Sequence, residues 1–216
     1  WSVTGGTADA ANNYEAVFSP DSSQIAFVTD RHGERQLYTM NADGSNQQRL
    51  IFHGAYTDDP TWSANDVIAF ESNPNGRYNI YQIPAAGGST LALISLGDSS
   101  STPAWSYDGS QIAFESRRGT NRHIWIANSD GTGLRQITSY GPSDERPAWK
   151  PDGSALAFHS NYQQADPDNV DIYVTDLTTQ ALTRLTNQGD CYDPTWALVP
   201  AGMADSLLAV SGNASQ

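Results

Sequence analysis

The sequence has little cysteine, little positive charge and no long hydrophobic run. Cys191 is the only cysteine among the 216 residues, so no disulfide within the chain can stabilise the fold. Eleven Lys and Arg residues stand against 24 Asp and Glu residues, a formal net charge of −13, and a nucleic-acid partner is not expected because such binding relies on basic side chains. No apolar run approaches the ~20 residues that cross a bilayer, and no charged-then-apolar signal segment opens the chain. We therefore expect a soluble monomer that does not insert into a membrane.

Catalytic motifs are also scarce. The sequence has no G-x-S-x-G nucleophile elbow, and Cys191 has no partner in a recognisable motif. The four histidines lie far apart in the sequence and form no H-E-x-x-H pair; they are His32, His53, His123 and His159. These absences weigh against an enzyme without excluding one.

What the sequence does have is one segment repeated five times. The copies run over Ala16 to Phe27, Pro60 to Phe70, Pro103 to Phe114, Pro147 to Phe158 and, in a degraded form, Pro194 to Val210. Each copy carries an anchor aromatic residue: Phe18, Trp62, Trp105, Trp149 and Trp196, which stand 44, 43, 44 and 47 residues apart. A period in the low forties is typical of the blades of a β-propeller.

Each period contains four short strand-like runs separated by turn signals. In the third copy these runs are Thr102 to Ser106, Gln111 to Ser116, His123 to Ala127 and Leu134 to Thr138. Asp-Gly pairs between alternating apolar runs indicate hairpins, because Asp and Gly tolerate the positive φ of such turns. The sequence therefore predicts an all-β fold of four-stranded antiparallel blades within a single domain spanning residues 1–216.

The two ends of the chain suggest how the blades are arranged. Four blades are expected at about 15–52, 59–95, 102–138 and 146–186, and the fifth, at 193–211, lacks strands that residues 1–4 can supply. Pairing these terminal strands would close a ring of five blades and remove exposed sheet edges. The alternative is a fragment of a six- or seven-bladed propeller, because the chain starts at Trp1 in mid-pattern.

The repeated W-S-x-D-G-S-x-I-A-F, I-Y-x-x-x-x-D-G and L-T segments resemble the WD40-like (PD40) repeat of TolB-type propellers over about residues 15 to 198. The resemblance implies a protein-binding scaffold outside the cytoplasm, periplasmic or secreted. The chain shows no N-terminal α/β domain and five copies where that family usually has six. Propellers of this type serve binding, gating and catalysis, so the repeat specifies the fold more closely than the function.

Candidate site residues follow from the position three residues before each anchor. These positions are Glu15, Asp59, Thr102, Arg146 and Asp193. The first strand of a blade lines the central channel, so a closed ring would place all five at the channel mouth, where ligands usually bind. Glu15, Asp59 and Asp193 would then be neighbours, and Ca²⁺ is the kind of ion that would neutralise three adjacent carboxylates.

These acids could also serve in two other ways. Each carboxylate could accept hydrogen bonds from backbone amides in its own turn, or the acids could act in catalysis. Asp166, Asp168 and Asp171 form a second candidate for a cation, although the Gly and the distal Glu of an EF-hand loop are missing.

The loops between second and third strands vary as a binding face should. Six basic residues lie in them: Arg31, Arg35, Arg77, Arg117, Arg118 and Arg122. Tyr78 and Tyr162 lie there as well, and Arg and aromatic residues dominate interface hot spots. We expect a protein or glycan ligand on this face, with Arg77, Tyr78 and Arg118 among the contact residues; solvated loops are the alternative.

The functional prediction is a non-catalytic binding scaffold. One alternative is a five-bladed glycoside hydrolase whose channel carboxylates act as acid and base. Another is the gating propeller of a prolyl-oligopeptidase-type peptidase that lacks its catalytic domain.

Overall fold

The computed structural model describes residues 11–52, 56–164, 166, 168–197 and 207–212. The chain divides between Pro103 and Ala104 into two compact units. Within the described residues no helix is long and apolar enough to span a membrane. The predicted single domain is not tested by this division and stays a prediction.

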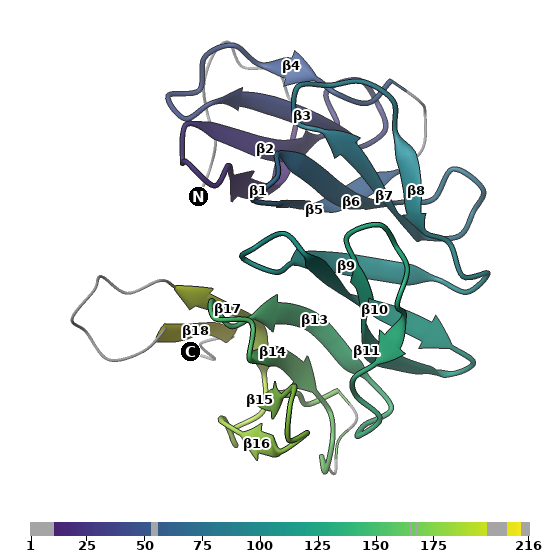
Figure 1. Cartoon of the computed structure of the whole chain (residues 1–216), viewed down its shortest axis with the longest axis vertical. Coiled ribbons are helices and arrows are strands. Elements are labelled where there is room, and N and C mark those ends of the chain that lie inside the picture. Colours follow the sequence, from purple (N-terminus) through teal and green to yellow (C-terminus); the bar gives the residue numbers. More distant parts are fainter. Residues whose placement is uncertain (1–10, 53–55, 165, 167, 198–206, 213–216) are drawn as a thin grey trace. The chain divides into compact units, whose positions relative to one another are not determined.

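The described residues form four four-stranded antiparallel sheets and one two-stranded sheet (Figure 1). The first sheet holds β1 (Asn13–Phe18), β2 (Gln24–Thr29), β3 (Gln36–Asn41) and β4 (Gln48–Arg49). The second holds β5 (Thr57–Trp62), β6 (Val67–Ser72), β7 (Asn79–Pro84) and β8 (Leu91–Ile94). The third holds β9 (Ser100–Trp105), β10 (Gln111–Arg118), β11 (Asn121–Asn128) and β12 (Arg135–Gln136). The fourth holds β13 (Asp144–Trp149), β14 (Ala155–Ser160), β15 (Asp171–Asp176) and β16 (Leu182–Arg184).

The fifth sheet pairs β17 (Cys191–Ala197) with β18 (Leu207–Gly212). Strands follow one another in chain order across each four-stranded sheet, so every blade is a meander. The predicted all-β fold of propeller-like blades is confirmed. The expected pairing of residues 1–4 with the last blade lies outside the described residues, so ring closure stays a prediction.

The hairpin turns form where the Asp-Gly signals predict them. At the turn after β3, the Asp43 carboxylate accepts hydrogen bonds from the Ser45 amide (2.9 Å) and hydroxyl (2.6 Å). Gly44 has φ +85, and a Cβ atom added there would meet no heavy atom within 4 Å, so this turn needs glycine for its backbone torsion rather than for space. The hydrogen bonds from Ser45 lower the pKa of Asp43. The side chain therefore stabilises the turn as a carboxylate.

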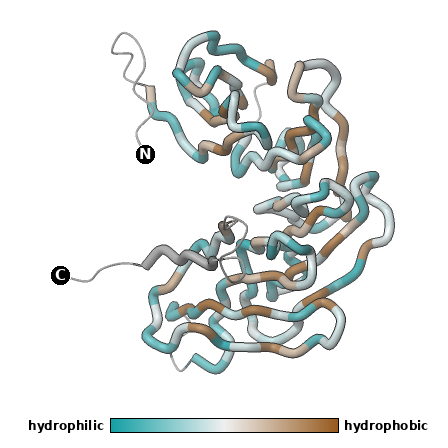
Figure 2. The backbone as a smooth tube through the Cα atoms, turned by 60° about the vertical axis from the view of Figure 1, so that its left-hand side comes forward, coloured by the Kyte–Doolittle hydropathy of each residue, from teal (hydrophilic) through white to brown (hydrophobic). Residues whose placement is uncertain are grey.

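The core consists of apolar side chains packed between consecutive sheets of each unit. Trp62 packs in one cluster with Leu37 of the first sheet, with Ile51, which follows β4, and with Phe70 of its own sheet. In the second unit Trp149 is 3 % exposed, and its indole N–H donates to the Ala104 carbonyl at 2.9 Å. Each such ring, when fully buried, contributes about 2–3 kcal/mol of hydrophobic stabilisation. Figure 2 shows hydrophobic stretches recurring along the backbone.

A buried hydroxyl at the end of the second strand fixes the start of the first strand in three of the sheets. Thr29, Ser72 and Ser160 are fully buried, and their hydroxyls donate to the Asn12 carbonyl (3.0 Å), the Tyr56 carbonyl (2.8 Å) and the Asp144 carboxylate (2.6 Å). Since an unsatisfied buried polar group is costly, these bonds define where each first strand begins. They therefore set the position of the residues discussed next.

Candidate functional site

The five positions predicted at the channel mouth share one unusual backbone conformation. Their φ angles are positive although none is glycine: Glu15 (45), Asp59 (47), Thr102 (47), Arg146 (52) and Asp193 (49). In four of the five first strands the register of pairing shifts across this residue and the next, the mark of a β-bulge. Five equivalent places thus share this backbone torsion and carry four kinds of side chain: Glu, Asp, Thr and Arg.

The sequence explains why the bulge forms there. The next residue is proline in four of the copies (Pro60, Pro103, Pro147 and Pro194) and Ala16 in the first. Proline cannot donate to the strand ladder, and within sheets it is confined to places such as bulges and edges. The bulge turns the preceding side chain away from the ladder, and Glu15 and Asp193 are exposed while the other three are partly exposed.

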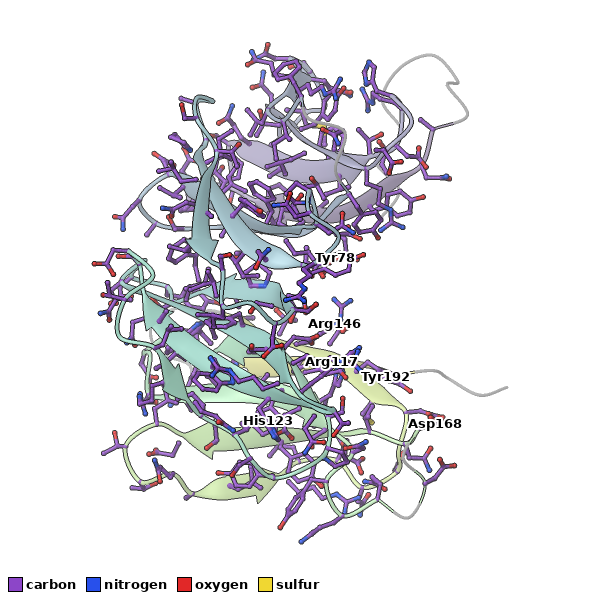
Figure 3. The ribbon with its side chains drawn as sticks, turned by 90° about the vertical axis from the view of Figure 1, so that its right-hand side faces the viewer. Tyr78, Arg117, His123, Arg146, Asp168 and Tyr192 are labelled. Carbon is purple, nitrogen blue, oxygen red and sulfur yellow. The ribbon has the colours of Figure 1, made fainter. Side chains whose placement is uncertain are left out.

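Two of the five side chains meet. Arg146 Nε lies 3.2 Å from Asp193 Oδ1, with side chains 40 % and 54 % exposed. Tyr192 precedes Asp193 on the same strand, and both it and Arg146 are labelled in Figure 3. Such an exposed ion pair contributes little to stability, so this one defines a local surface more than it holds the fold.

Buried side chains of the preceding blade accept hydrogen bonds from the backbone amides of two bulge residues. The Thr102 N–H donates to Glu71 Oε2 at 3.2 Å, and the Asp193 N–H donates to His159 Nδ1 at 3.4 Å. Glu71 and His159 occupy equivalent positions on β6 and β14, directly after the repeated Ala-Phe pair. A bulge leaves its extra residue outside the ladder, so the amide of that residue has no partner strand to donate to. Glu71 and His159 supply the hydrogen-bond acceptors for these amides.

The first unit places a group of tyrosines around one ion pair. Arg35 forms a close ion pair with Asp58, donates to the Tyr56 hydroxyl at 2.6 Å and lies 3.7 Å above the centre of the Tyr14 ring. Tyr56 also donates to Asp58 Oδ2 at 2.7 Å, and burial, followed by this hydrogen bond, raises the pKa of Tyr56. Tyr78 meets Tyr56 edge to face at a centroid distance of 6.0 Å. Tyr78 of the predicted loop face therefore belongs to an ordered aromatic surface beside Asp58, the residue next to the bulge.

The second unit has a charged group at the equivalent place. Arg122 Nη1 lies 3.0 Å from Glu145 Oε1 and 3.8 Å from Glu115 Oε1, and the Ser143 hydroxyl also donates to Glu145. Burial by itself would raise the pKa of Glu145. Hydrogen bonds from His159 and Ser143 and the charges of Arg122 and His159 outweigh burial and lower that pKa to about 2. Glu145 therefore stays ionised at neutral pH.

The other predicted loop residues make local contacts. The Arg118 guanidinium lies 4.0 Å above the centre of the Trp125 ring, and Arg77 donates to the Gly97 carbonyl. Arg117 is exposed at the end of β10 and is labelled in Figure 3. Arg77 and Arg118 are thus held at the surface, and their role in binding stays a prediction.

The structure gives mixed results for the predicted cation sites. Among the described residues no group of three or more His, Cys, Asp or Glu side chains is arranged to hold a metal ion. For Asp166, Asp168 and Asp171 the prediction is wrong, because Asp171 is fully buried and already accepts hydrogen bonds from Arg184 (2.5 Å) and Thr186 (2.8 Å). Such a carboxylate has no need of a metal ion.

The first cation candidate spans the two units. Glu15 and Asp59 belong to the first unit and Asp193 to the second, so their convergence stays a prediction.

Reasoning from the sequence missed four polar residues beside the bulge positions. Asp58, Glu71, Glu145 and His159 each lie next to a residue that the repeat had identified, and all but Glu145 are less than 9 % exposed. Asp58 pairs with Glu71 across β5 and β6, and Glu145 pairs with His159 across β13 and β14. For Glu71 and His159 the available signal was a charged or polar residue after Ala-Phe, inside an otherwise apolar strand. For Asp58 and Glu145 it was an acidic residue directly before Asp59 and Arg146.

Four meander sheets with a fifth partial one, each with the same positive φ in its first strand, define a protein of the β-propeller repeat class. The family model for the TolB beta propeller domain (PD40) matches residues 3–90 and 59–200. The chain belongs to this family.

Relatives in sequence match only part of the chain. A Tol-Pal system protein TolB of Anaeromyxobacter dehalogenans is 39 % identical over 51 residues, 24 % of this chain and 12 % of the relative. A Tol-Pal system protein TolB of Syntrophotalea carbinolica is 41 % identical over 46 residues, 21 % of this chain and 11 % of the relative. The chain thus matches a small share of the length of these relatives.

Solved structures match over most of the chain. TolB from Acinetobacter baumannii superposes with a TM-score of 0.76 at 19 % identity, covering 95 % of this chain and 53 % of that one. A putative TolB from Agrobacterium tumefaciens gives 0.73 at 21 % identity, with 92 % and 73 % covered. The chain spans about half the length of the first of these structures, and at these identities the likeness supports the fold alone.

Proposed function

We propose that this chain is a non-catalytic binding module that contacts a protein partner through its bulge positions and the adjacent loop face. The observation that carries the proposal is the shared backbone conformation at five places bearing Glu, Asp, Thr, Arg and Asp side chains. A constant scaffold with varied exposed side chains is the usual arrangement of a recognition surface. Glycans are the other ligand class that an Arg- and Tyr-rich face suits.

The relatives suggest where to look for the partner. The sequence relatives are named as proteins of a Tol-Pal system, so we propose an extracytoplasmic, periplasmic location and a partner from such a system. This proposal rests on matches to a minor part of each relative. It concerns the surface of this chain and not the whole activity of those proteins.

Calorimetry tests the binding role. The probe is the purified soluble Pal component of a Tol-Pal system, titrated into the native chain, Arg146→Ala and Ser129→Ala. Ser129 lies exposed in the turn after β11 and serves as the matched control. We expect Arg146→Ala to weaken binding by about 1–2 kcal/mol, the usual size for an interface arginine, and Ser129→Ala to leave binding unchanged. Equal affinities for all three proteins would mean that the bulge positions do not contribute to binding.

We also propose that the blades close into a ring of five. β17 carries the fifth bulge and the fifth anchor, Trp196, although only two strands of its sheet are described. Phe18, the anchor of β1, is 57 % exposed, whereas Trp62, Trp105 and Trp149 are 3–8 % exposed. A fifth blade beside β1 would cover Phe18 and bring Glu15 next to Asp193.

Calcium is a separate candidate ligand within this proposal. In a closed ring Glu15, Asp59 and Asp193 would bring three carboxylates together, and hard oxygen ligands suit Ca²⁺. The Arg146 guanidinium near Asp193 already offsets part of that charge. Calorimetry with Ca²⁺ on the native chain and on Asp59→Ala tests the idea. Absence of heat, with no change in melting temperature, would rule it out.

A further inference from the structure

The hairpin of β10 and β11 ends in an exposed, positively charged tip. These strands have eight residues each, whereas the second and third strands of the other four-stranded sheets have six. The extra length adds the cross-strand pairs Arg117 with Arg122 and Arg118 with Asn121. We call residues 117–122 the hairpin tip. It contains three arginines and no Asp or Glu in a chain whose formal net charge is −13, so a partner meets positive charge here on an acidic protein.

Contacts within the second unit keep the hairpin tip ordered. Gly119, with φ +70, is the first of the two residues that join the strands, the position that a type II′ hairpin turn reserves for glycine. The Arg122 N–H donates to the Pro142 carbonyl at 3.0 Å, which fastens the tip to the segment before β13. The Arg118 guanidinium lies over the Trp125 ring. A tip held in this way loses little conformational freedom when it binds.

Arg117 carries a charge that the fold does not use. It stands directly opposite Arg122, and like charges in that arrangement are destabilising. Glu145 and Glu115, at 3.0 and 3.8 Å, offset the charge of Arg122. The Arg117 side chain is exposed and makes no hydrogen bond or ion pair with the described residues. Its guanidinium is therefore available to a partner.

We propose that the hairpin tip binds a carboxylate-rich segment of a protein partner, with Arg117 and Arg118 as the contact residues. This proposal rests on the proposed function, a protein-binding loop face, and specifies the chemistry of the partner. A guanidinium forms two parallel hydrogen bonds with one carboxylate, which gives the contact both strength and a defined geometry. At physiological ionic strength the Debye length is about 8 Å, so a bound segment responds to the tip more than to acidic side chains elsewhere on the chain.

The two arginines favour a flexible segment over a flat charged surface. Successive strand residues point to opposite faces, so Arg117 and Arg118 lie on the two sides of the hairpin. A flat surface meets only one side, whereas an extended acidic chain reaches both. Asn121 shares a side with Arg118. Its side-chain carbonyl accepts the Thr120 hydroxyl at 3.1 Å, and its amide N–H groups suit a peptide carbonyl of the partner.

Calorimetry with poly-L-glutamate as the acidic segment tests the proposal. This probe is titrated at about 50 mM salt, where charge interactions are weakly screened, into the native chain, Arg117→Gln, Arg118→Gln and Arg135→Gln. Arg135 is the matched control, because it is exposed on β12 of the same sheet and its replacement removes the same charge. We expect each tip variant to weaken binding about fivefold, the size of one interface arginine contact, and Arg135→Gln to change it less than about twofold.

Thermal unfolding separates recognition from structure. Arg117→Gln removes a like-charged pair and no contact, so its melting temperature should equal or exceed that of the native chain. A lower melting temperature would give Arg117 a structural role and count against the proposal. An equal loss of affinity in Arg117→Gln and Arg135→Gln would overturn it, because net charge alone would then explain the binding. So would a native chain that does not bind poly-L-glutamate, or one that binds the polysaccharide alginate as tightly.

This proposal and the proposed function fail separately. A native chain that binds poly-L-glutamate through the hairpin tip but does not bind Pal would keep this site and lose the proposed partner. A chain that binds Pal equally well with and without Arg117, and does not bind poly-L-glutamate, would keep the proposed function and lose this site.

Discussion

In each of the five described first strands, one non-glycine residue has a left-handed backbone conformation. Such a torsion costs of order 1–3 kcal/mol and persists only where neighbours hold it. Here a following proline favours the bulge, and Glu71 or His159 accepts the amide of Thr102 or Asp193. The cost at these two bulges is thus offset by contacts with the preceding blade, and the side chain of the bulge residue is left available for recognition.

The charged residues behind the bulges make stability depend on pH. The folded pKa of Glu145, about 2, lies below its ordinary value of 4.5. A lowered folded pKa means that the stabilisation is complete above about pH 4.5 and is lost as the pH falls toward about 2. We expect Glu145→Gln to remove about 2 kcal/mol of stability at neutral pH, after allowance for solvent screening, and less at pH 2.

Urea unfolding of native chain and variant between about pH 2 and 7 measures this difference. Glu34→Gln is the matched control, because Glu34 is exposed. A loss in Glu145→Gln that does not shrink on acidification would show that its cause is packing rather than charge.

The five equivalent positions of the first strands could be located from the sequence, but the residues that support them could not, and the channel mouth that they would line stays a prediction. Counting back from each anchor located Asp59, Thr102 and Asp193, because repeated blades place equivalent residues equivalently. Glu71 and His159 were missed because their role depends on contacts between blades, which a period along the chain does not describe. The positive φ was equally invisible, since no glycine marks it.

At the scale of the element, the observed strands agree closely with the strands expected from the sequence wherever a turn marks the end of a strand. Strands β2 and β3 are joined where the sequence predicted, and Asp-Gly pairs give the hairpin after β3. The outermost strands are shorter than expected. β12 covers Arg135–Gln136, whereas the sequence predicted a strand over Leu134 to Thr138. An edge strand has one neighbour, so its apolar pattern extends beyond the residues that actually pair.

The turn after β3 offers a clean test of local conformation. Gly44→Ala should cost about 1 kcal/mol, because a left-handed torsion disfavours a Cβ atom while nothing nearby obstructs it. Gly44→Asn should cost less than half as much, since asparagine tolerates this region. Thermal unfolding of the two variants checks the order. Equal losses would mean that the side chain, and not the torsion, determines the effect.

At the scale of the whole molecule, ring closure predicts that a neighbouring blade covers the first sheet. Within the described residues Phe18 is exposed although Trp62, Trp105 and Trp149 are buried. If a neighbouring blade covers it in solution, Phe18→Ala should destabilise the chain by about 2 kcal/mol or more. Phe52→Ala, at a residue that is 74 % exposed, should change stability by less than about 0.5 kcal/mol. Urea unfolding measures the loss of stability in each variant. Similar small losses in both would indicate that no neighbouring blade covers Phe18.

Spin-label proximity tests ring closure most directly. With Cys191 replaced by Ser, nitroxides are placed on cysteines at Glu15 and Asp193, which become neighbours only in a closed ring of five. The calibration pair is Arg146 with Asp193, whose side chains are in contact. Packed sheets lie about 10 Å apart, so a closed ring predicts dipolar broadening of the spectrum for Glu15 with Asp193, as for the calibration pair. Broadening for the calibration pair alone would contradict closure, and with it the single mouth on which the proposed binding surface depends.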